Sequence, residues 1–461
     1  MLKDFNFSCI NLGCTKNLVD SQYLLGKIFS STQKQIGLNL KYFSDPKDFN
    51  VQYVFLNTCG FLSTGRQEMI DEIKSLLKNK KKIIIIGCGL KYFQLAKNFP
   101  KSDINSQKEI SSRNKLIKNK NISFLSWSDL DKFSLQSIIK QKNINFTNSD
   151  YFFSNSPRAY TNASLGFEYL KIAEGCDTCC TFCIIPKIRG KQKSQTIPKI
   201  LSEVKNIINT GIQEIILIAQ DSSRYGMDIY RQPSLIKLLQ EIDKIPGKFQ
   251  YRVLYVYPDF LNSKFLLQLQ KLKKFVPYFD IPLQHISGEL LKKMGRHYST
   301  QNIINILNQI KKIFPIRFIR TNFIIGFPGE TEKHFNQLIS FIKKFNFDNI
   351  ALFEYHDEPM AASFKLPDKV NPKIIRQRFV KLQKLVNQIL NQKQKSRIGK
   401  IYQGTIVEIL KGKKFSIRPQ ISSPEIDPCD KINFNQLISF ITQQKKSEIN
   451  IGDKINYKLK N

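Results

Sequence analysis

The sequence predicts an α/β protein in three parts: an N-terminal parallel α/β sheet domain (residues 1–130), a central partial (β/α)6 barrel (166–395) and a small C-terminal β-barrel (397–461). Three observations lead to this prediction. Strands and helices alternate in the first part, six further strands alternate with helices in the second, and short strands separated by turns fill the third. Strand–helix alternation is typical of parallel sheets, and a run of short strands is typical of small barrels.

The composition is strongly basic but gives little information about partners. The 461 residues include 72 lysines and arginines and 37 acidic residues, a formal net charge of +35. Such a charge suits nucleic-acid or ribosome contact, although lysine, asparagine and isoleucine are abundant everywhere and indicate a general bias. No apolar run has membrane-spanning length and MLKDFNFSCINLG lacks a signal-peptide pattern, so we expect a cytoplasmic protein without a membrane contact. Nine cysteines then favour metal binding or catalysis over disulfides.

The first part shows three strands, at residues 5–12, 51–56 and 82–86, with helical stretches after the first two. Cys14, Cys59 and Cys88 each follow one of these strands. A lone cysteine in such a place is most often a small buried side chain. The carboxyl ends of parallel strands lie at one edge of a sheet, however, so three such cysteines can converge there as a three-thiolate site.

The polar segment from residue 131 to 165 is rich in asparagine and serine and has little periodicity, which predicts a connector. The six strands expected after it span 168–172, 214–219, 252–257, 278–283, 319–325 and 349–355. In a parallel barrel the chemistry belongs at the carboxyl ends of the strands. Asn371 and Pro372 then begin a helix, whose apolar stripe indicates packing against the barrel.

A cysteine motif, CxxxCxxC, follows the first barrel strand. It consists of Cys176, Cys180 and Cys183. Three thiolates on one loop can bind three irons of a 4Fe-4S cluster and leave the fourth iron open. Cys179 makes two alternatives possible: two CxxC pairs for zinc, whose back-to-back spacing is unsuitable, and a CxxCxxxC reading. We interpret Cys179 as a bystander.

The motif resembles that of the radical S-adenosylmethionine (SAM) superfamily, in which SAM chelates the open iron and is cleaved reductively. The segments LGCTKNLVDSQ and NTCGFL, with Gly87-Cys88, resemble the N-terminal domain of the radical SAM methylthiotransferases. This resemblance implies an auxiliary 4Fe-4S cluster held by Cys14, Cys59 and Cys88. The segment after Cys88 follows the family less closely.

Further segments are similar to one branch of that family, the RimO branch. They are KIAEGC, IIPKIRGKQKSQ, LIAQDSSRYGMD, YVYP, DIPLQHIS with LLKKMGR, and TNFIIGFPGET. The branch transfers a methylthio group to the β-carbon of an aspartate in small-subunit ribosomal protein twelve. The sister branch, which modifies a tRNA adenosine, has different sequences at several of these places. The ribosomal-protein branch is therefore the better match.

Four residues are candidates for SAM contact. Phe182 precedes the last cysteine of the motif, Gln220 and Gln284 stand at strand ends, and Gly326 lies in a Gly-Phe-Pro-Gly turn that lets backbone approach a ligand. Each also has a plainer interpretation, as an ordinary loop residue or a solvent-facing polar residue. No histidine has ligand spacing, and we expect His285 at most to buttress the rim.

The last part shows short strands at 402–410, 414–419, 431–434 and 453–458 and resembles the TRAM domain that ends these enzymes. Its SSPEIDP segment matches the ribosomal-protein branch, where this domain is thought to grip the protein substrate. An oligonucleotide-binding barrel is an alternative because the segment is basic. Cys9 and Cys429 are interpreted as free thiols.

The resemblance implies a division of labour. The cluster on the CxxxCxxC motif would reduce SAM, and the resulting 5′-deoxyadenosyl radical would take hydrogen from the aspartate. The auxiliary cluster would present the sulfur, a second SAM would supply the methyl group, and flavodoxin or ferredoxin would donate electrons. No catalytic residue is expected beyond the cluster ligands. The alternatives are a tRNA adenosine methylthiotransferase and a non-catalytic iron–sulfur or zinc protein that binds the ribosome.

Overall fold

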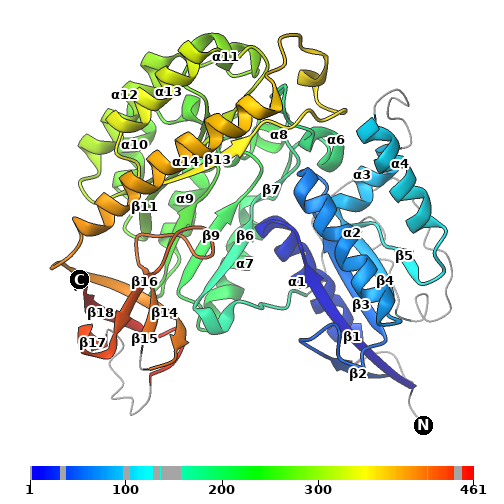
Figure 1. The fold of residues 1–461 in the computed structure, drawn as a ribbon. Helices are drawn as coiled ribbons and strands as arrows, with labels where there is room; N and C mark the ends of the chain where they lie inside the picture. The colour runs from blue at the N-terminus through cyan, green and yellow to red at the C-terminus, as the bar shows by residue number, and fades with distance from the viewer. Residues whose placement is uncertain are drawn as a thin grey trace. The chain divides into compact units, whose positions relative to one another are not determined.

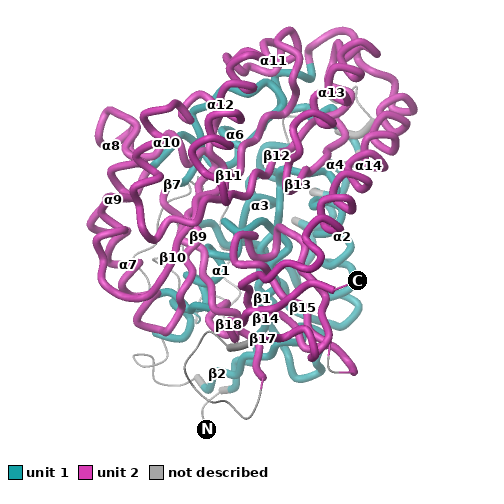
Figure 2. The backbone as a smooth tube through the Cα atoms, turned by 90° about the vertical axis from the view of Figure 1, so that its left-hand side faces the viewer, with its two compact units in different colours: residues 1–160, 173–193, 356–364 teal, residues 161–172, 194–355, 365–461 magenta. Residues whose placement is uncertain are grey.

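The computed structural model describes residues 3–31, 38–96, 104–127, 135, 157–412, 414–440 and 449–460. The chain divides into two compact units, coloured separately in Figure 2. Unit 1 comprises residues 1–160, 173–193 and 356–364, and unit 2 comprises residues 161–172, 194–355 and 365–461. Most of the predicted connector, residues 131–165, lies outside the described residues. The predicted domain boundaries stay predictions.

Unit 1 is built on a five-stranded parallel sheet with the strand order β2-β1-β3-β4-β5 (Figure 1). The strands are β1 (Lys3–Asn11), β2 (Leu38–Tyr42), β3 (Tyr53–Thr58), β4 (Lys82–Gly87) and β5 (Ile122–Phe124). The predicted N-terminal parallel sheet is confirmed. The sequence did not reveal β2 and β5, which are short strands at the two edges of the sheet.

The centre of this sheet reflects its sequence directly. Every residue of β3 is buried, and β4 is buried from Ile83 to Gly87. Central parallel strands are covered on both faces, which is why they read as continuous apolar, β-branched runs. The remaining elements of unit 1 are α1 (Thr15–Ser31), α2 (Ser63–Lys78), α3 (Cys88–Ala96), α4 (Ile104–Ile117), β7 (Ala173–Glu174) and α6 (Ile185–Arg189).

Unit 2 contains a six-stranded parallel sheet whose strands follow one another in chain order. They are β6 (Phe167–Lys171), β9 (Glu214–Ile218), β10 (Gln250–Val253), β11 (Phe275–Gln284), β12 (Phe318–Ile325) and β13 (Asn349–Glu354). The predicted partial (β/α)6 architecture is confirmed. The strand predicted to run to residue 257 ends at Val253, because Tyr255 adopts a left-handed φ of 61° that breaks extended pairing.

Helices connect these strands. The longer ones are α7 (Ile197–Asn209), α9 (Leu235–Lys244), α10 (Ser263–Gln270), α12 (Thr300–Ile313), α13 (Glu332–Lys344) and α14 (Pro372–Lys395). The shorter elements are η2 (Ala163–Leu165), β8 (Lys193–Ser194), η3 (Ser222–Arg224), α8 (Met227–Tyr230), η4 (Pro258–Phe260), α11 (Gly288–Lys293) and η5 (Ala362–Lys365).

Helix α14 begins as its sequence predicted. The side chain of Asn371 accepts a hydrogen bond from the backbone N–H of Lys373, and Pro372 occupies the first turn. Ile375, Leu382 and Val386 are buried along one face, and the helix contacts α13, β12 and β13. The apolar stripe is therefore a packing surface.

The C-terminal part of unit 2 is a curled antiparallel half-barrel with the strand order β16-β15-β14-β18-β17. Its elements are β14 (Ile401–Leu410), β15 (Lys414–Pro419), β16 (Asp430–Asn433), η6 (Phe434–Gln436), β17 (Leu437–Phe440) and β18 (Lys454–Lys458). The sequence did not reveal β17. Alternate residues of β15 and β18, including Phe415, Ile417, Ile455 and Tyr457, form its apolar core.

A buried charge cluster joins this half-barrel to the parallel sheet of the same unit. The carboxylate of Glu214 on β9 pairs with Arg252 and with Arg418, each at 2.6 Å. The two guanidiniums also donate to backbone carbonyls of Ile421 and Ser422. All three charged side chains are at most 2% exposed, so the cluster is compensated inside the protein.

The SSPEIDP segment takes part in the same junction. Tyr169 on β6 donates to the carboxylate of Glu425 at 2.9 Å, and the Asn349 amide on β13 donates to that of Asp427 at 2.7 Å. The segment thus ties the half-barrel to strands at both edges of the parallel sheet.

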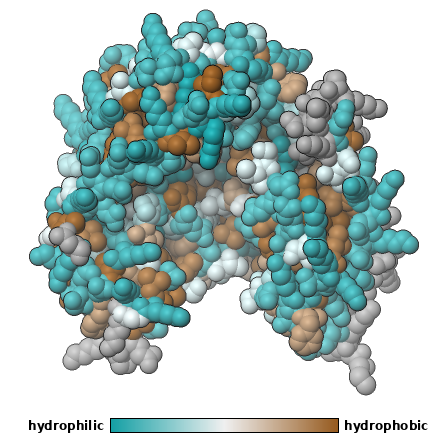
Figure 3. Space-filling view, in the orientation of Figure 1, coloured by the Kyte–Doolittle hydropathy of each residue, from teal (hydrophilic) through white to brown (hydrophobic). Residues whose placement is uncertain are grey.

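Hydrophilic side chains cover most of the face drawn in Figure 3, as the excess of lysine and arginine leads one to expect. Among the described residues, no helix combines the length and the apolar character that crossing a membrane requires.

Candidate metal centre

The three strand-end cysteines of unit 1 lie at one edge of its sheet. Cys14 follows β1, Cys59 follows β3 and Cys88 follows β4, and these three strands are neighbours in the sheet. The carboxyl ends of adjacent parallel strands are brought together by the pairing itself. The structure therefore places the three predicted residues side by side, and we call them the auxiliary trio.

Contacts show how closely the auxiliary trio is gathered. One atom, Oδ1 of Asn17, accepts from the thiols of Cys14 and Cys88 at 3.5 and 3.7 Å. A Cβ added to Gly60 would overlap the backbone carbonyl of Cys88, so the loop that carries Cys59 needs glycine to approach this closely. Burial raises the pKa of the Cys59 thiol, and the nearby Cys14 acts in the same direction.

Asn17 is held in place by a second asparagine. Its Nδ2 donates to Oδ1 of Asn57 at 2.9 Å and to the carbonyl of Thr58 at 3.0 Å. Asn57 in turn donates to the carbonyl of Asn17 at 2.7 Å and to the hydroxyl of Ser21 at 2.9 Å. Both amides are buried. These bonds fix the amide so that its oxygen faces the two sulfurs.

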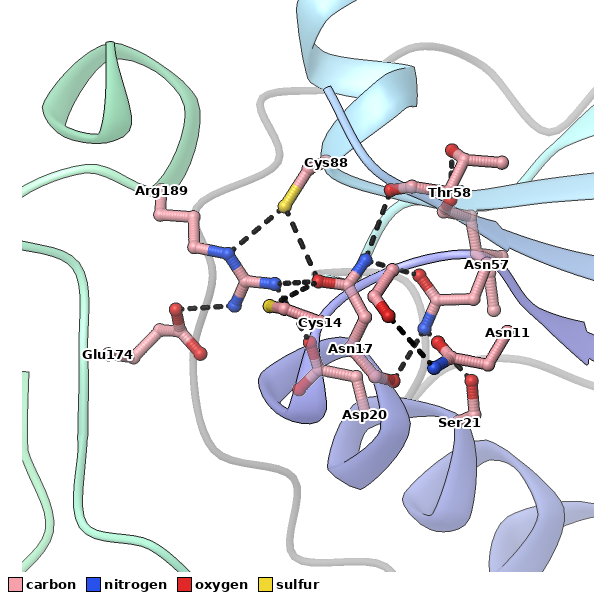
Figure 4. A network of polar contacts seen from close by, with 12 residues as sticks. Asn11, Cys14, Asn17, Asp20, Ser21, Asn57, Thr58, Cys88, Glu174 and Arg189 are labelled. Atoms are coloured by element: carbon pink, nitrogen blue, oxygen red, sulfur yellow. Dashed lines mark hydrogen bonds and ion pairs between the residues drawn. The ribbon is translucent and has the colours of Figure 1, made fainter. Parts of the chain in front are cut away.

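A buried arginine from the neighbouring loop reaches the same point (Figure 4). Arg189, at the end of α6, donates from Nε to Sγ of Cys88 at 3.1 Å and from Nη2 to Oδ1 of Asn17 at 2.5 Å. Its Nη1 pairs with Glu174 at 2.6 Å, and its Nη2 lies 3.5 Å from Asp20. A cation thus stands beside a candidate metal-binding sulfur.

The CxxxCxxC loop also belongs to unit 1 and is stabilised by its own backbone. Cys176 donates to the carbonyl of Gly190 at 3.1 Å, and Cys183 donates to that of Cys180 at 3.1 Å. The backbone N–H groups of Thr178 and Ile185 point at the sulfurs of Cys176 and Cys183, both at 3.4 Å. Such N–H donors suit sulfur that carries negative charge, as cluster ligands do.

Cys179 differs from its three neighbours in the loop. Its side chain is exposed, and its thiol lies 3.7 Å from the carbonyl of Asp177. Cys176 and Cys180, in contrast, are buried, and Cys183 is half-buried. The assignment of Cys179 as a bystander stays a prediction, and this difference in exposure supports it.

Residues 356–364 brace both cysteine regions within unit 1. Ser363 donates to the carbonyl of Thr181 at 2.8 Å, and Lys187 donates to that of Met360 at 2.6 Å. Glu358 pairs at 2.9 Å with Arg66, whose guanidinium lies 4.0 Å from the centre of the Tyr92 ring.

Arg66 also holds the loop after Cys59. Its guanidinium donates to the carbonyls of Gly60 at 3.2 Å and Phe61 at 3.3 Å. This side chain is 5% exposed, so its carbonyl partners and Glu358 replace the water that it has lost.

Several of these side chains were not singled out by sequence reasoning. Asn17 lies in TKN, Glu174 in KIAEGC and Arg189 in IIPKIRG, so the motifs contained them without assigning them a role. Arg66 and Glu358 are 292 positions apart, and no local pattern could pair them.

The predicted SAM contacts lie in both units. Phe182 is half-buried in the cysteine loop of unit 1, and Gln220 is half-buried after β9 in unit 2. Gln284 ends β11 with a left-handed φ of 67° and accepts from Asn322 at 2.8 Å. Gly326 also has a left-handed φ, of 80°, and a Cβ there would overlap Ile375 of α14. Packing alone therefore requires glycine at 326, and all four contacts stay predictions.

His285 is fully buried next to Gln284. Its Nδ1 accepts from the backbone N–H of Ser287 at 2.9 Å, and its Nε2 lies 3.7 Å from the carboxylate of Glu330. Glu330 also accepts from the backbone N–H of Gly326 at 3.0 Å and pairs with Arg378 at 2.8 Å. The histidine is part of this turn's internal support.

The residues present fit an iron–sulfur group. Within the described ranges, no three cysteine, histidine or acidic side chains converge as ligands of one metal ion do. Thiolates of a 4Fe-4S cluster bind three different irons and stand farther apart than that. At the auxiliary trio, gathered thiols, a glycine-lined loop and an arginine cation make a suitable environment for such a cluster. At the CxxxCxxC loop, backbone N–H groups that point at the sulfurs are equally suitable.

Two family descriptions match the chain. Residues 170–342 match the radical SAM superfamily, and residues 6–105 match the uncharacterized protein family UPF0004. Membership of the radical SAM superfamily implies SAM and a 4Fe-4S cluster as cofactors.

Relatives match over nearly the whole chain. The ribosomal protein uS12 methylthiotransferase RimO of Carboxydothermus hydrogenoformans is 36% identical over 425 residues, with 91% of each chain covered. The RimO of Clostridium kluyveri is 35% identical over 462 residues, covering 98% of this chain and 95% of its own. Among solved structures, the radical SAM methyltransferase TsrM of Kitasatospora setae is 12% identical, with a TM-score of 0.49 over 77% of this chain and 75% of its own. Given the two RimO relatives, the chain belongs to the RimO family of radical SAM methylthiotransferases.

Proposed function

We propose that this chain transfers a methylthio group to the β-carbon of an aspartate in ribosomal protein uS12. The observation that carries the proposal is its likeness, over more than nine-tenths of its length, to proteins named for that reaction on uS12. The auxiliary trio and the CxxxCxxC loop, which lie in one compact unit, supply the two sets of thiols that the chemistry needs.

Each set of cysteines would hold one cluster. Cys176, Cys180 and Cys183 would bind the radical SAM cluster, and the auxiliary trio would bind the second. When bound, the clusters would supply the electron for SAM cleavage and a site for the transferred sulfur, and the resulting radical chemistry would reach an unactivated C–H bond that acid–base groups cannot.

The chain's own side chains orient these ligands. Asn17 faces two sulfurs of the auxiliary trio, and Arg66 holds the loop that presents Cys59. Backbone N–H groups direct the sulfurs of Cys176 and Cys183. Phe182, Gln220, Gln284 and Gly326 are the candidates for SAM contact. An electron donor such as flavodoxin or ferredoxin, ribosome contact and a cytoplasmic location belong to the same proposal.

The deciding experiment measures the mass of uS12 from cells with and without this chain. We expect uS12 to carry one methylthio group in place of a hydrogen only when the chain is present, and peptide fragmentation should place it on an aspartate. Mass analysis of tRNA nucleosides from the same cells is the matched control. Unmodified uS12 together with a methylthio-adenosine that depends on the chain would favour the tRNA reaction instead.

Counting metal separates both reactions from a non-catalytic binding protein. After anaerobic reconstitution we expect about eight irons per chain, as two four-iron clusters require. The reconstituted chain should also cleave SAM under reducing conditions. Bound zinc without SAM cleavage would support a binding role and contradict the proposed function.

A further inference from the structure

The buried guanidinium of Arg189 connects the two cysteine regions of unit 1. It belongs to α6, which begins two residues after Cys183, and yet it donates to Cys88 of the auxiliary trio. The side chain is 1% exposed, so its charge is compensated by protein groups. Figure 4 shows the guanidinium between Glu174 on one side and Cys88 and Asn17 on the other.

The carboxylates of Glu174 and Asp20 alone do not account for the orientation of the Arg189 guanidinium. Nη1 of Arg189 already meets Glu174 at 2.6 Å, whereas Nε is aimed at the sulfur of Cys88 at 3.1 Å. A neutral thiol is a weak acceptor, and a thiolate accepts a much stronger, charge-assisted bond from a guanidinium. The contact therefore becomes most favourable when Cys88 is a deprotonated ligand.

Asn17 holds the arginine beside the auxiliary trio. Its Oδ1 accepts a hydrogen bond from Nη2 of Arg189 at 2.5 Å and contacts the thiols of both Cys14 and Cys88. Asn17 thus holds Nη2 of the guanidinium, while Nε contacts the Cys88 sulfur directly. The carboxylates of Glu174 and Asp20 pair with the same guanidinium and offset part of its positive charge.

We infer that Arg189 is a positioning residue that raises the reduction potential of the auxiliary cluster, with Glu174 and Asp20 limiting that rise. The inference rests on the proposed function, because it requires a cluster on the auxiliary trio. Reduction adds one electron and therefore one negative charge to the cluster, and a cation bonded to a ligand sulfur stabilises this reduced form. Loss of the cation must lower the potential, and loss of an opposing carboxylate must raise it.

The test uses the full chain with Cys176, Cys180 and Cys183 replaced by alanine, so that the auxiliary cluster is the only one expected. After anaerobic reconstitution, three quantities are measured: iron per chain, the electron paramagnetic resonance spectrum of the reduced cluster, and its midpoint potential by redox titration. None of them depends on turnover.

In this background, Arg189→Gln should shift the midpoint to a more negative potential and change the resonance spectrum. Arg189→Lys keeps the charge without the fixed fork of donors, so its midpoint should lie between those of Arg189→Gln and the chain with Arg189 intact. Glu174→Gln should shift the midpoint in the opposite direction. This second variant keeps the inference testable even where Arg189→Gln prevents folding.

Arg252→Lys is the matched control. It alters another fully buried arginine–carboxylate pair. The guanidinium of Arg252 contacts Glu214 and backbone carbonyls, and none of these partners is a sulfur atom. We expect Arg252→Lys to lower stability and leave the midpoint and the spectrum unchanged.

The outcomes separate the inference from the proposed function. The inference alone would be overturned if the triple-alanine chain binds about four irons and its midpoint potential is unchanged by Arg189→Gln, Arg189→Lys and Glu174→Gln. The role of Arg189 would then be structural. A background chain that has Arg189 intact and binds no iron would overturn the auxiliary cluster, and the inference with it.

Discussion

Each unit of the molecule contains a buried charge centre in which one side chain is shared by two side chains of opposite charge, and these two centres are arranged in opposite ways. In unit 2, one carboxylate, Glu214, is shared by two arginines. In unit 1, one arginine, Arg189, is shared by two carboxylates, Glu174 and Asp20. Both centres are compensated, as buried charges must be. Their remaining partners differ.

In unit 2, the remaining partners of the two arginines are backbone carbonyls of residues 420–422, which directly follow β15. The excess positive charge of this centre meets the negative ends of peptide dipoles. The centre in unit 1 is completed by Cys88 and Asn17. The two centres therefore differ in one partner: Arg189 donates to a thiol that is a candidate cluster ligand, whereas Arg252 and Arg418 donate to a carboxylate and to backbone carbonyls.

The largest expected effect comes from removing ligands in unit 1. Cys176→Ala should abolish reductive SAM cleavage, whereas Cys59→Ala should retain cleavage and lose methylthio transfer. The reason is that only the CxxxCxxC cysteines would hold the cluster that meets SAM. Chromatographic measurement of 5′-deoxyadenosine, beside the mass of uS12, separates the two defects. Equal loss of cleavage in both variants would contradict separate roles. Cys179→Ala is the control and should affect neither product.

A smaller but still large effect should follow from removing Glu214 in unit 2. Glu214→Ala leaves two buried guanidiniums without their carboxylate, which typically costs about 3–5 kcal/mol. Urea unfolding should report this loss, and Glu241→Ala, at a partly exposed residue of α9 that pairs with the largely exposed Lys244, should cost far less. A Glu214→Ala chain as stable as the parent would show that the carbonyl partners suffice and would remove the contrast between the two centres.

The same carboxylate predicts an acid dependence. Burial works to raise the pKa of Glu214, but the Arg252 and Arg418 guanidiniums outweigh burial and hold that pKa below its ordinary value of 4.5. Because the folded-state pKa is the lower one, the ionised carboxylate stabilises the fold above about pH 4.5, and this stabilisation is lost as the pH falls through the lowered value. Stability should therefore fall more steeply below pH 4.5 in the parent than in Glu214→Gln. Urea midpoints on both sides of that pH measure the slopes, and parallel slopes would refute the assignment.

The smallest effect is expected from an arginine–carboxylate pair at the surface. Arg376 on α14 lies 2.8 Å from Glu354, but its side chain is 66% exposed. Arg376→Gln should cost at most about 0.2–1 kcal/mol, because water screens the pair and solvates each partner alone. Thermal unfolding at low and high salt measures this. A cost as large as that of Glu214→Ala would mean that burial does not distinguish the pairs.

The sequence by itself determined most of the architecture. The continuous apolar runs of β3 and β4, the strand–helix alternation of unit 2 and the Asn371–Pro372 helix start are local patterns, and each formed the element it predicted. The short edge strands β2, β5 and β17 were missed, because three to five residues carry too little periodicity. The six cysteines were proposed from spacing and strand ends, which are also local.

Only the tertiary structure decided which groups stand around those cysteines. The contact from Arg189 to Cys88 spans 101 positions, and the Arg66–Glu358 pair spans 292. Such partners are chosen by how strands and loops pack, and a buried charge must find its compensation wherever the fold brings an opposite group. A sequence can therefore specify the strand after which a thiol stands, while the charge and the hydrogen bonds at that thiol are set by residues far away in the chain.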